Sequence, residues 1–137
     1  MSKELSKRQL KGITRIQSED TILLDSKKWT IVIPHTHRNA VYWSKDTHWD
    51  TATPNDDLFF TMYKKRGDLI IFIDKRKGIK YQLHVKDRLF LNGDNVSVNP
   101  LQFFKDRDTL LTAILNHLQN QDERWEFVKF VFNSKNL

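Results

Sequence analysis

The segment from residue 69 to residue 98 has the patterning of an antiparallel β-meander, and it constrains the fold more than any other feature. It opens with five consecutive apolar residues, Leu69 to Ile73, a short run typical of a central strand buried on both faces. Residues 79–85 then alternate between apolar and polar side chains, which is the period of a half-exposed strand. Asn92-Gly93 is a strong hairpin turn. The segment predicts a four-stranded meander over residues 69–73, 79–85, 89–91 and 96–98.

Shorter elements precede the meander. Residues 21–33 have the pattern of a β-hairpin, two β-rich runs joined by a polar turn. Short helices are expected over residues 37–43 and 58–65, and the acidic residues before the second helix are suitable N-caps. In that second helix we expect Leu58 and Met62 to face the core, with Phe59 and Tyr63 as further candidates.

Three helices are expected after the meander, over residues 100–105, 109–118 and 123–133. In the last helix Trp125, Val128 and Phe132 lie on one stripe, which we expect to be mostly core. The predicted fold class is α+β, a single domain over residues 21–137. It combines an antiparallel β-meander, short inserted helices and a C-terminal helix pair packed on the sheet. Residues 1–20 are predicted to form an N-terminal basic arm or short helix.

The composition limits the class of protein. A chain of 137 residues suits one domain, and 39% hydrophobic with 12% aromatic residues is enough to bury a core. No run of about 18 apolar residues is present, so we expect no membrane-spanning helix and a cytoplasmic protein. The chain has no cysteine, which excludes disulfides, a thiol nucleophile and thiolate metal sites.

Positive charge is concentrated in the middle of the chain. The net charge is +6, and residues 61–90 alone hold nine basic and three acidic side chains. Clustered positive charge suits a polyanion-binding surface, although a solvated surface that keeps the protein soluble is the more ordinary explanation. We expect Lys80, Gln82 and His84 to project from one exposed polar face of the sheet. The candidate nucleic-acid-binding residues are Lys64, Lys65, Arg66, Lys75, Arg76, Lys77, Lys80 and Arg88.

An aromatic and polar cluster lies between the hairpin and the meander, and its density marks either a local core or a site. The residues of this motif loop are Trp43, Thr47, His48, Trp49, Asp50 and Thr51. We expect residues 44–54 to lie across the sheet, held by Trp43 and Trp49.

An acid–base pair could be drawn from His48 and Asp50, but no nucleophile elbow or phosphate-binding glycine loop accompanies them. We expect no metal and no cofactor, because the chain's histidines lack the further ligands of a metal site.

The central segment resembles a family of small phage and prophage proteins. The family pattern begins with an apolar strand that ends near Pro-x-Thr, followed by a Tyr-Gly-Lys-Gly-Thr-Lys-Trp-Cys-Thr-Ala stretch. A Leu-Tyr-Ile-Ile strand, a basic turn, a Lys-Tyr-Gln-Leu-His strand and an Asp-containing turn come next. The corresponding residues here are Ile33 to Thr36, Tyr42 to Ala52, Leu69 to Ile73, Lys80 to His84 and Asn92 to Asp94. Asp50 occupies the position of the family's cysteine and cannot act as a thiolate. The resemblance therefore implies phage origin and a shared fold more than an activity.

These observations together favour non-catalytic binding by a phage accessory protein in the host cytoplasm, with nucleic acid as the first-choice partner. The main alternative is an inhibitor that binds a host protein, such as a defence or transcription factor. An enzyme that uses His48 and Asp50 is the third possibility. The chain is expected to be a monomer or a homodimer, with no membrane partner.

Overall fold

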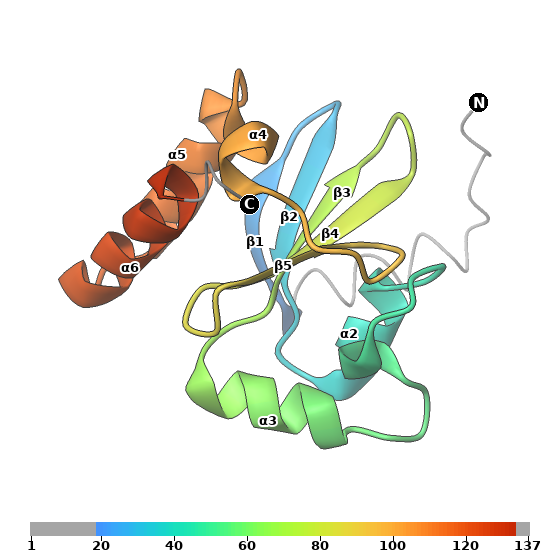
Figure 1. The fold of residues 1–137 in the computed structure, drawn as a ribbon. Coiled ribbons are helices and arrows are strands. Elements are labelled where there is room, and N and C mark those ends of the chain that lie inside the picture. The colour runs from blue at the N-terminus through green and yellow to red at the C-terminus, as the bar shows by residue number, and fades with distance from the viewer. Residues whose placement is uncertain (1–18, 134–137) are drawn as a thin grey trace.

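The computed structural model describes residues 19–133, and its centre is a five-stranded antiparallel sheet (Figure 1). The strands follow one another across the sheet in chain order, so the predicted hairpin and the predicted meander are parts of one sheet. The two parts join where Ile31 pairs with Phe72. The strands are β1 (Thr21–Asp25), β2 (Trp29–Ile33), β3 (Ile70–Asp74), β4 (Ile79–His84) and β5 (Leu89–Asn92).

The predicted last strand of the meander, over residues 96–98, does not form as a strand. This segment makes one isolated bridge, between Ser97 and Leu91. It also exchanges two backbone hydrogen bonds with β5, of 2.9 Å and 2.8 Å. The preceding turn places Asn95 in the left-handed region, with φ of 66°. The pairing is too short for a sixth strand, yet it covers part of the edge that β5 would otherwise present to solvent.

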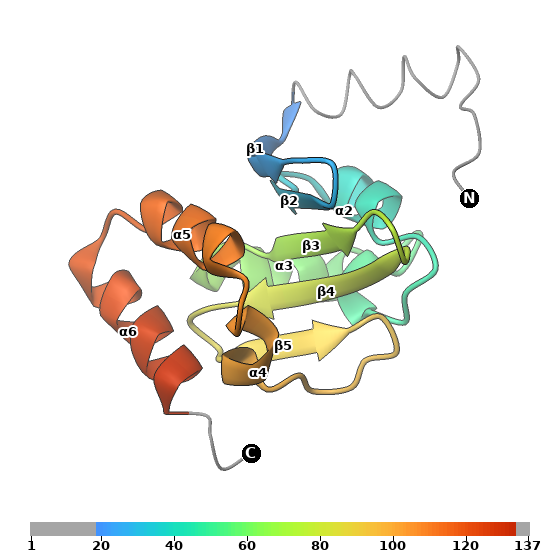
Figure 2. The same ribbon diagram turned by 90° about the horizontal axis from the view of Figure 1, so that it is seen from above.

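Helices cover both faces of the sheet, as Figure 2 shows. One group is inserted between β2 and β3, and the other follows β5. The inserted elements are α2 (His37–Trp43), the short 3₁₀ helix η1 (Asp50–Ala52) and α3 (Leu58–Arg66). The C-terminal elements are α4 (Pro100–Phe104), α5 (Asp108–His117) and α6 (Gln121–Phe132). This arrangement confirms the predicted α+β fold with helices packed on an antiparallel sheet.

Side-chain caps fix where several of these helices begin. The Thr36 hydroxyl accepts the N–H of the third α2 residue at 3.1 Å. Asn99 does the same at the start of α4, where Pro100 occupies the first turn and needs no donor of its own. The Asn120 side chain accepts two N–H groups of α6. Each such cap stabilises its helix by about 1 kcal/mol.

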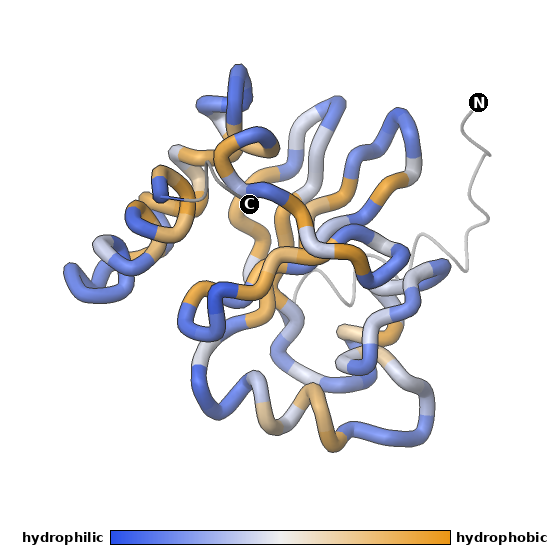
Figure 3. The backbone as a smooth tube through the Cα atoms, viewed as in Figure 1, coloured by the Kyte–Doolittle hydropathy of each residue, from blue (hydrophilic) through white to orange (hydrophobic). Residues whose placement is uncertain are grey.

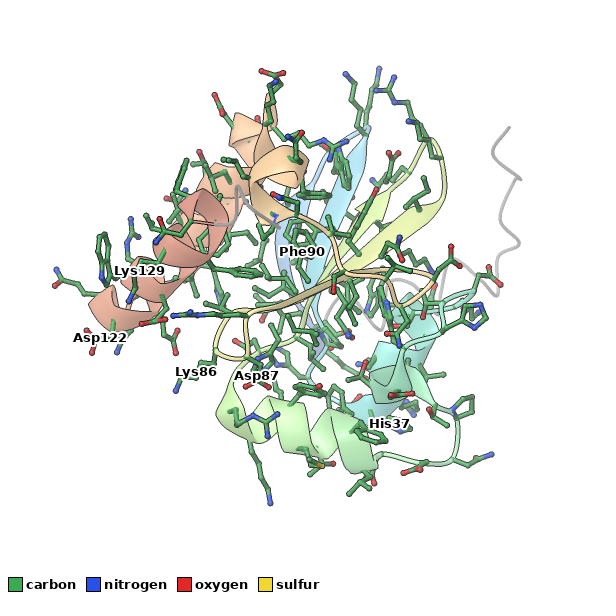
Figure 4. All side chains as sticks on the ribbon, in the orientation of Figure 1. His37, Lys86, Asp87, Phe90, Asp122 and Lys129 are labelled. Atoms are coloured by element: carbon green, nitrogen blue, oxygen red, sulfur yellow. The ribbon has the colours of Figure 1, made fainter. Side chains whose placement is uncertain are left out.

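The sheet has a core on each face, because alternate residues of β3 point to opposite sides. Ile70 and Phe72 pack against the C-terminal helices, whereas Ile71 packs under the two tryptophans of the motif loop. The Phe72 ring lies 5.3–5.9 Å from three other phenylalanine rings, including that of Phe90, which Figure 4 labels. This confirms the prediction that the apolar run forms a central strand buried on both sides.

The predicted core face of α3 is wrong for Leu58, Phe59 and Met62, whereas Tyr63 packs against the core as predicted. Phe60 is the buried residue of this helix, and it packs with Ala40 and Leu69. Leu58 and Met62 are 56% and 43% exposed. The helix is therefore rotated relative to the prediction, because its apolar residues offered two possible faces and the one that carries Phe60 is buried.

The predicted buried stripe of α6 is also wrong, because the helix is rotated about its axis relative to the prediction. Phe127 and Val131 are buried in the core beneath α6. Trp125 and Phe132 are exposed instead, and the Trp125 ring lies under the Lys129 ammonium at 5.8 Å. The predicted stripe and the observed one are neighbours on the helix, so the sequence pattern separated them poorly.

The domain begins earlier than residue 21. Asp20 is buried, and its carboxylate accepts hydrogen bonds from the His35 N–H, the Asn39 amide and the Trp43 indole. Most of the predicted N-terminal arm, residues 1–18, lies outside the described residues. Within residues 19–133, no helix is long and apolar enough to cross a membrane.

Candidate nucleic-acid interface

The motif loop belongs to the core of the protein. Trp43 and Trp49 pack on Val32 and Ile71 of the sheet, as the sequence predicted. The Trp49 indole N–H donates to the Asn92 carbonyl at 2.7 Å. This loop therefore ties the inserted helices to the far end of β5.

The two candidate acid–base residues of the loop do not form a site. His48 and Asp50 are both exposed, and no hydrogen bond or ion pair joins them. Asp50 lines a pocket of about 250 Å³ together with Thr51 and Gln82, but His48 does not. Among the described residues no group of three or more histidine or acidic side chains could hold a metal ion.

The predicted exposed polar face of β4 is wrong. Gln82 and His84 are 2% and 0% exposed, because the inserted elements cover them. The Thr51 hydroxyl donates to the Gln82 carboxamide at 2.6 Å, and His84 Nε2 donates to the Tyr63 carbonyl at 2.9 Å. Lys80 donates to a backbone carbonyl at 2.9 Å, and burial lowers the pKa of this lysine. The polar residues of β4 thus bond within the protein and offer no face to a ligand.

The remaining candidate cations, and the other basic residues beside them, fall at two opposite ends of the sheet rather than on one surface. We call the first the helix end, which comprises the C-terminus of α3 and the β4–β5 turn, with Lys64, Lys65, Arg66, Lys86 and Arg88. We call the second the loop end, which comprises the β1–β2 turn, the β3–β4 turn and the α4–α5 connection, with Lys27, Lys28, Lys75, Arg76, Lys77 and Arg107. The length of β3, five residues or roughly 17 Å, separates the two ends. The expectation of a single basic surface is therefore wrong.

Carboxylates neutralise most of the helix end. Lys64 pairs with Asp68 at 2.6 Å, and Arg88 pairs with Glu126 at 2.9 Å. Arg66 forms a two-pronged pair with Asp87, and its hydrogen bonds lower the pKa of that carboxyl. Figure 4 labels Asp87 on the β4–β5 turn beside α3. Among the described residues, these pairs leave Lys65 and Lys86 as the unpaired cations of the helix end.

The two turns of the loop end are joined to each other. The backbone N–H of Lys75 donates to the Lys28 carbonyl at 2.8 Å. The Lys75 ammonium reaches the Ser26 carbonyl at 2.7 Å and the Asp25 carboxylate at 2.5 Å. The bond from Lys75 lowers the pKa of Asp25. Lys75 therefore holds the turns in register instead of facing a ligand.

The other cations of the loop end have no such partners. No carboxylate lies within salt-bridge distance of Lys27, Lys28, Arg76 or Lys77 in the described part of the chain. The nearby Asp74 carboxylate accepts the backbone N–H groups of Arg76 and Lys77, at 3.0 Å and 3.1 Å. Both turns are hydrophilic throughout (Figure 3).

A groove of about 500 Å³ lies beside these turns, between the sheet and the start of α5. Its lining includes Lys28, Arg76, Lys77 and Arg107, against two carboxylates, Asp74 and Asp106. The Arg107 guanidinium lies 5.2 Å from the Trp29 ring centre, and it donates to the Phe103 carbonyl at 3.0 Å. The groove therefore has one cation held against an aromatic ring and three that are exposed.

The prediction from the sequence named only part of this interface. It included Arg76 and Lys77 but missed Lys28, Trp29 and Arg107. The order of strands supplies the missing signal, because β2 beside β3 brings their two turns to the same end of the sheet. The charge count along the chain carries no such information.

No protein-family model, curated protein or solved structure matches this chain. The resemblance to phage proteins, and the host-cytoplasm location that follows from it, therefore stay predictions.

Proposed function

We propose that the protein binds nucleic acid without catalysis, through the sugar–phosphate backbone and at the loop end. The observation that carries the proposal is a set of cations around the groove that no carboxylate of residues 19–133 pairs, Lys28, Arg76 and Lys77, with Arg107 behind them. Phosphate binding requires a surface of this kind and little else, because counterion release supplies most of the affinity.

The arrangement favours a chain of phosphates over a single anion. Three of the cations lie on exposed turns, where their side chains can follow a flexible backbone. Arg107 is held by stacking on Trp29, and a guanidinium fixed in this way can meet a phosphate oxygen with two parallel hydrogen bonds. Turn lysines and a fixed arginine together suit several phosphates, with no base-specific contact required.

The test measures binding of a labelled single-stranded DNA at several salt concentrations. Each phosphate contact adds about 0.7 to the slope of log affinity against log salt on a single strand. The double variant Arg76→Ala/Lys77→Ala should therefore lower the slope by about 1.4 and weaken binding at 100 mM salt by tenfold or more.

The matched control removes two cations from the helix end, in Lys65→Ala/Lys86→Ala. Both lysines are exposed and neither has a carboxylate partner within residues 19–133, so the net charge changes equally. This control should keep the wild-type slope. Equal losses in the two variants would show that binding follows net charge alone, and a slope near zero would favour a protein partner instead.

A further inference from the structure

The outer face of α3 is apolar although nothing in the described part of the protein covers it. Leu58, Phe59 and Met62 are all substantially exposed, the middle one at 39%. Residues three and four positions apart lie on one side of a helix, so Met62 neighbours both Phe59 and Leu58 and links the three side chains into one stripe. Grouped apolar residues on a short surface helix are typical of an interaction surface.

Opposite charges flank this stripe. Asp57 lies at the N-terminus of α3 and Lys65 in its last turn, eight residues or about 12 Å further along. Both are exposed, and neither has an ion-pair partner in the described part of the chain. A partner helix with the same sequence that runs in the opposite direction would place an opposite charge beside each of these two residues.

We propose that two copies of this chain associate through α3, with the two helices antiparallel across a twofold axis. In that arrangement Asp57 of each copy faces Lys65 of the other, and the two apolar stripes bury each other. A twofold interface uses the same patch on both copies, which this helix satisfies because its stripe and its charges are self-complementary. Antiparallel helix dipoles add a further favourable contribution.

The interface is small, and it leaves the loop end free. A helix of nine residues buries less than the roughly 1,200 Å² of a stable interface, so we expect a weak dimer that depends on protein concentration. Figure 1 shows α3 at the end of the sheet opposite the β1–β2 and β3–β4 turns. The dimer therefore carries two accessible loop ends, independent of whether the loop end binds nucleic acid.

The test is sedimentation velocity of the full chain from about 10 μM to 1 mM, with charge-reversal variants. Wild type should shift from monomer to dimer over this range. Asp57→Lys alone and Lys65→Glu alone each place like charges together twice per dimer, so each should weaken association by about tenfold. An equimolar mixture of the two variants should form heterodimers, because both charge pairs then become opposite again. The double variant Asp57→Lys/Lys65→Glu should also recover.

Two controls separate this arrangement from other causes. Lys27→Glu makes the same charge change as Lys65→Glu at the loop end and should leave association unchanged. Met62→Glu keeps the Asp57 and Lys65 charges but breaks the apolar stripe, so it should abolish the dimer, while far-UV circular dichroism confirms that the variant is folded. A wild type that stays monomeric at 1 mM overturns the proposal. Single variants that dimerise normally, or a mixture that does not recover, overturn the antiparallel geometry.

Discussion

The buried Asp20 carboxylate should be worth about 3 kcal/mol of folding free energy, although it precedes the first strand. It accepts hydrogen bonds from the His35 N–H at 2.9 Å, from Asn39 at 3.1 Å and from the Trp43 indole at 2.8 Å. It thereby fixes α2 to the start of the domain, together with Trp43, which packs on Val32 and Ile71 of the sheet. We predict that Asp20→Ala destabilises the protein by that amount.

The magnitude follows from what each donor loses. Hydrogen bonds to charged groups contribute about 1.5–3 kcal/mol each, so three bonds set an upper bound of about 4.5–9 kcal/mol. Two of the donors keep an alternative, however. Asn39 also donates to Glu19 at 3.1 Å, and His35 is exposed so that water can reach its N–H. Only the buried Trp43 indole is left without a partner, which reduces the expected cost to about 3 kcal/mol.

Urea unfolding monitored by far-UV circular dichroism measures this cost directly. Combining Asp20→Ala with Trp43→Phe forms a double-mutant cycle, and we expect a coupling energy of about 1–2 kcal/mol. Asp94→Ala is the control, because this exposed carboxylate should contribute less than about 0.5 kcal/mol. A cost below about 1 kcal/mol for Asp20→Ala, or no coupling with Trp43, would refute the reasoning.

Two further predictions concern the turns. Arg66 lowers the pKa of Asp87, and a carboxylate with a lowered folded-state pKa stabilises the protein above about pH 4 but loses this contribution at lower pH. Arg66→Gln should therefore lower the free energy of unfolding at pH 7, and much less at pH 3, as measured by urea titration. Equal losses of unfolding free energy at the two pH values would contradict a contribution from the ionised Asp87. Gly78 has φ of 70°, and a Cβ there would meet no atom within 4 Å. Gly78→Ala should thus cost about 1 kcal/mol from backbone strain alone, and an unchanged urea midpoint would contradict this.

The sequence predicted the sheet well because strand patterning reflects burial on defined faces. The run from Leu69 to Ile73 has apolar residues on both sides, and the structure buries both sides under helices. The turn residues on either side of this run also predicted closely where the neighbouring strands begin and end. The short strand predicted over residues 96–98 failed because the chain turns away after a single bridge, which depends on the backbone of Asn95 rather than on apolar patterning.

Helix orientation and the polar face of β4 were predicted poorly, for a shared physical reason. Both depend on what the rest of the chain places opposite a residue. Gln82 and His84 alternate with apolar neighbours just as solvent-facing residues do, but Thr51 and Tyr63 supply buried hydrogen-bond partners. A strand pattern of polar residues therefore cannot distinguish an exposed face from one that is covered and satisfied.

The division of the basic residues between two ends follows from topology and could have been deduced from the predicted meander. Successive connections in an antiparallel meander lie at alternate ends of the sheet, so the residues before β3 and those after it cannot share a surface. The cluster before β3, from Lys64 to Arg66, joins the β4–β5 turn and its carboxylates. The cluster after β3, from Lys75 to Lys77, joins the β1–β2 turn and its lysines instead. Charges that are adjacent in sequence thus separate by one strand length, and charges 50 residues apart meet. For a chain of this topology, the unit that predicts a binding surface is the set of turns at one end of the sheet.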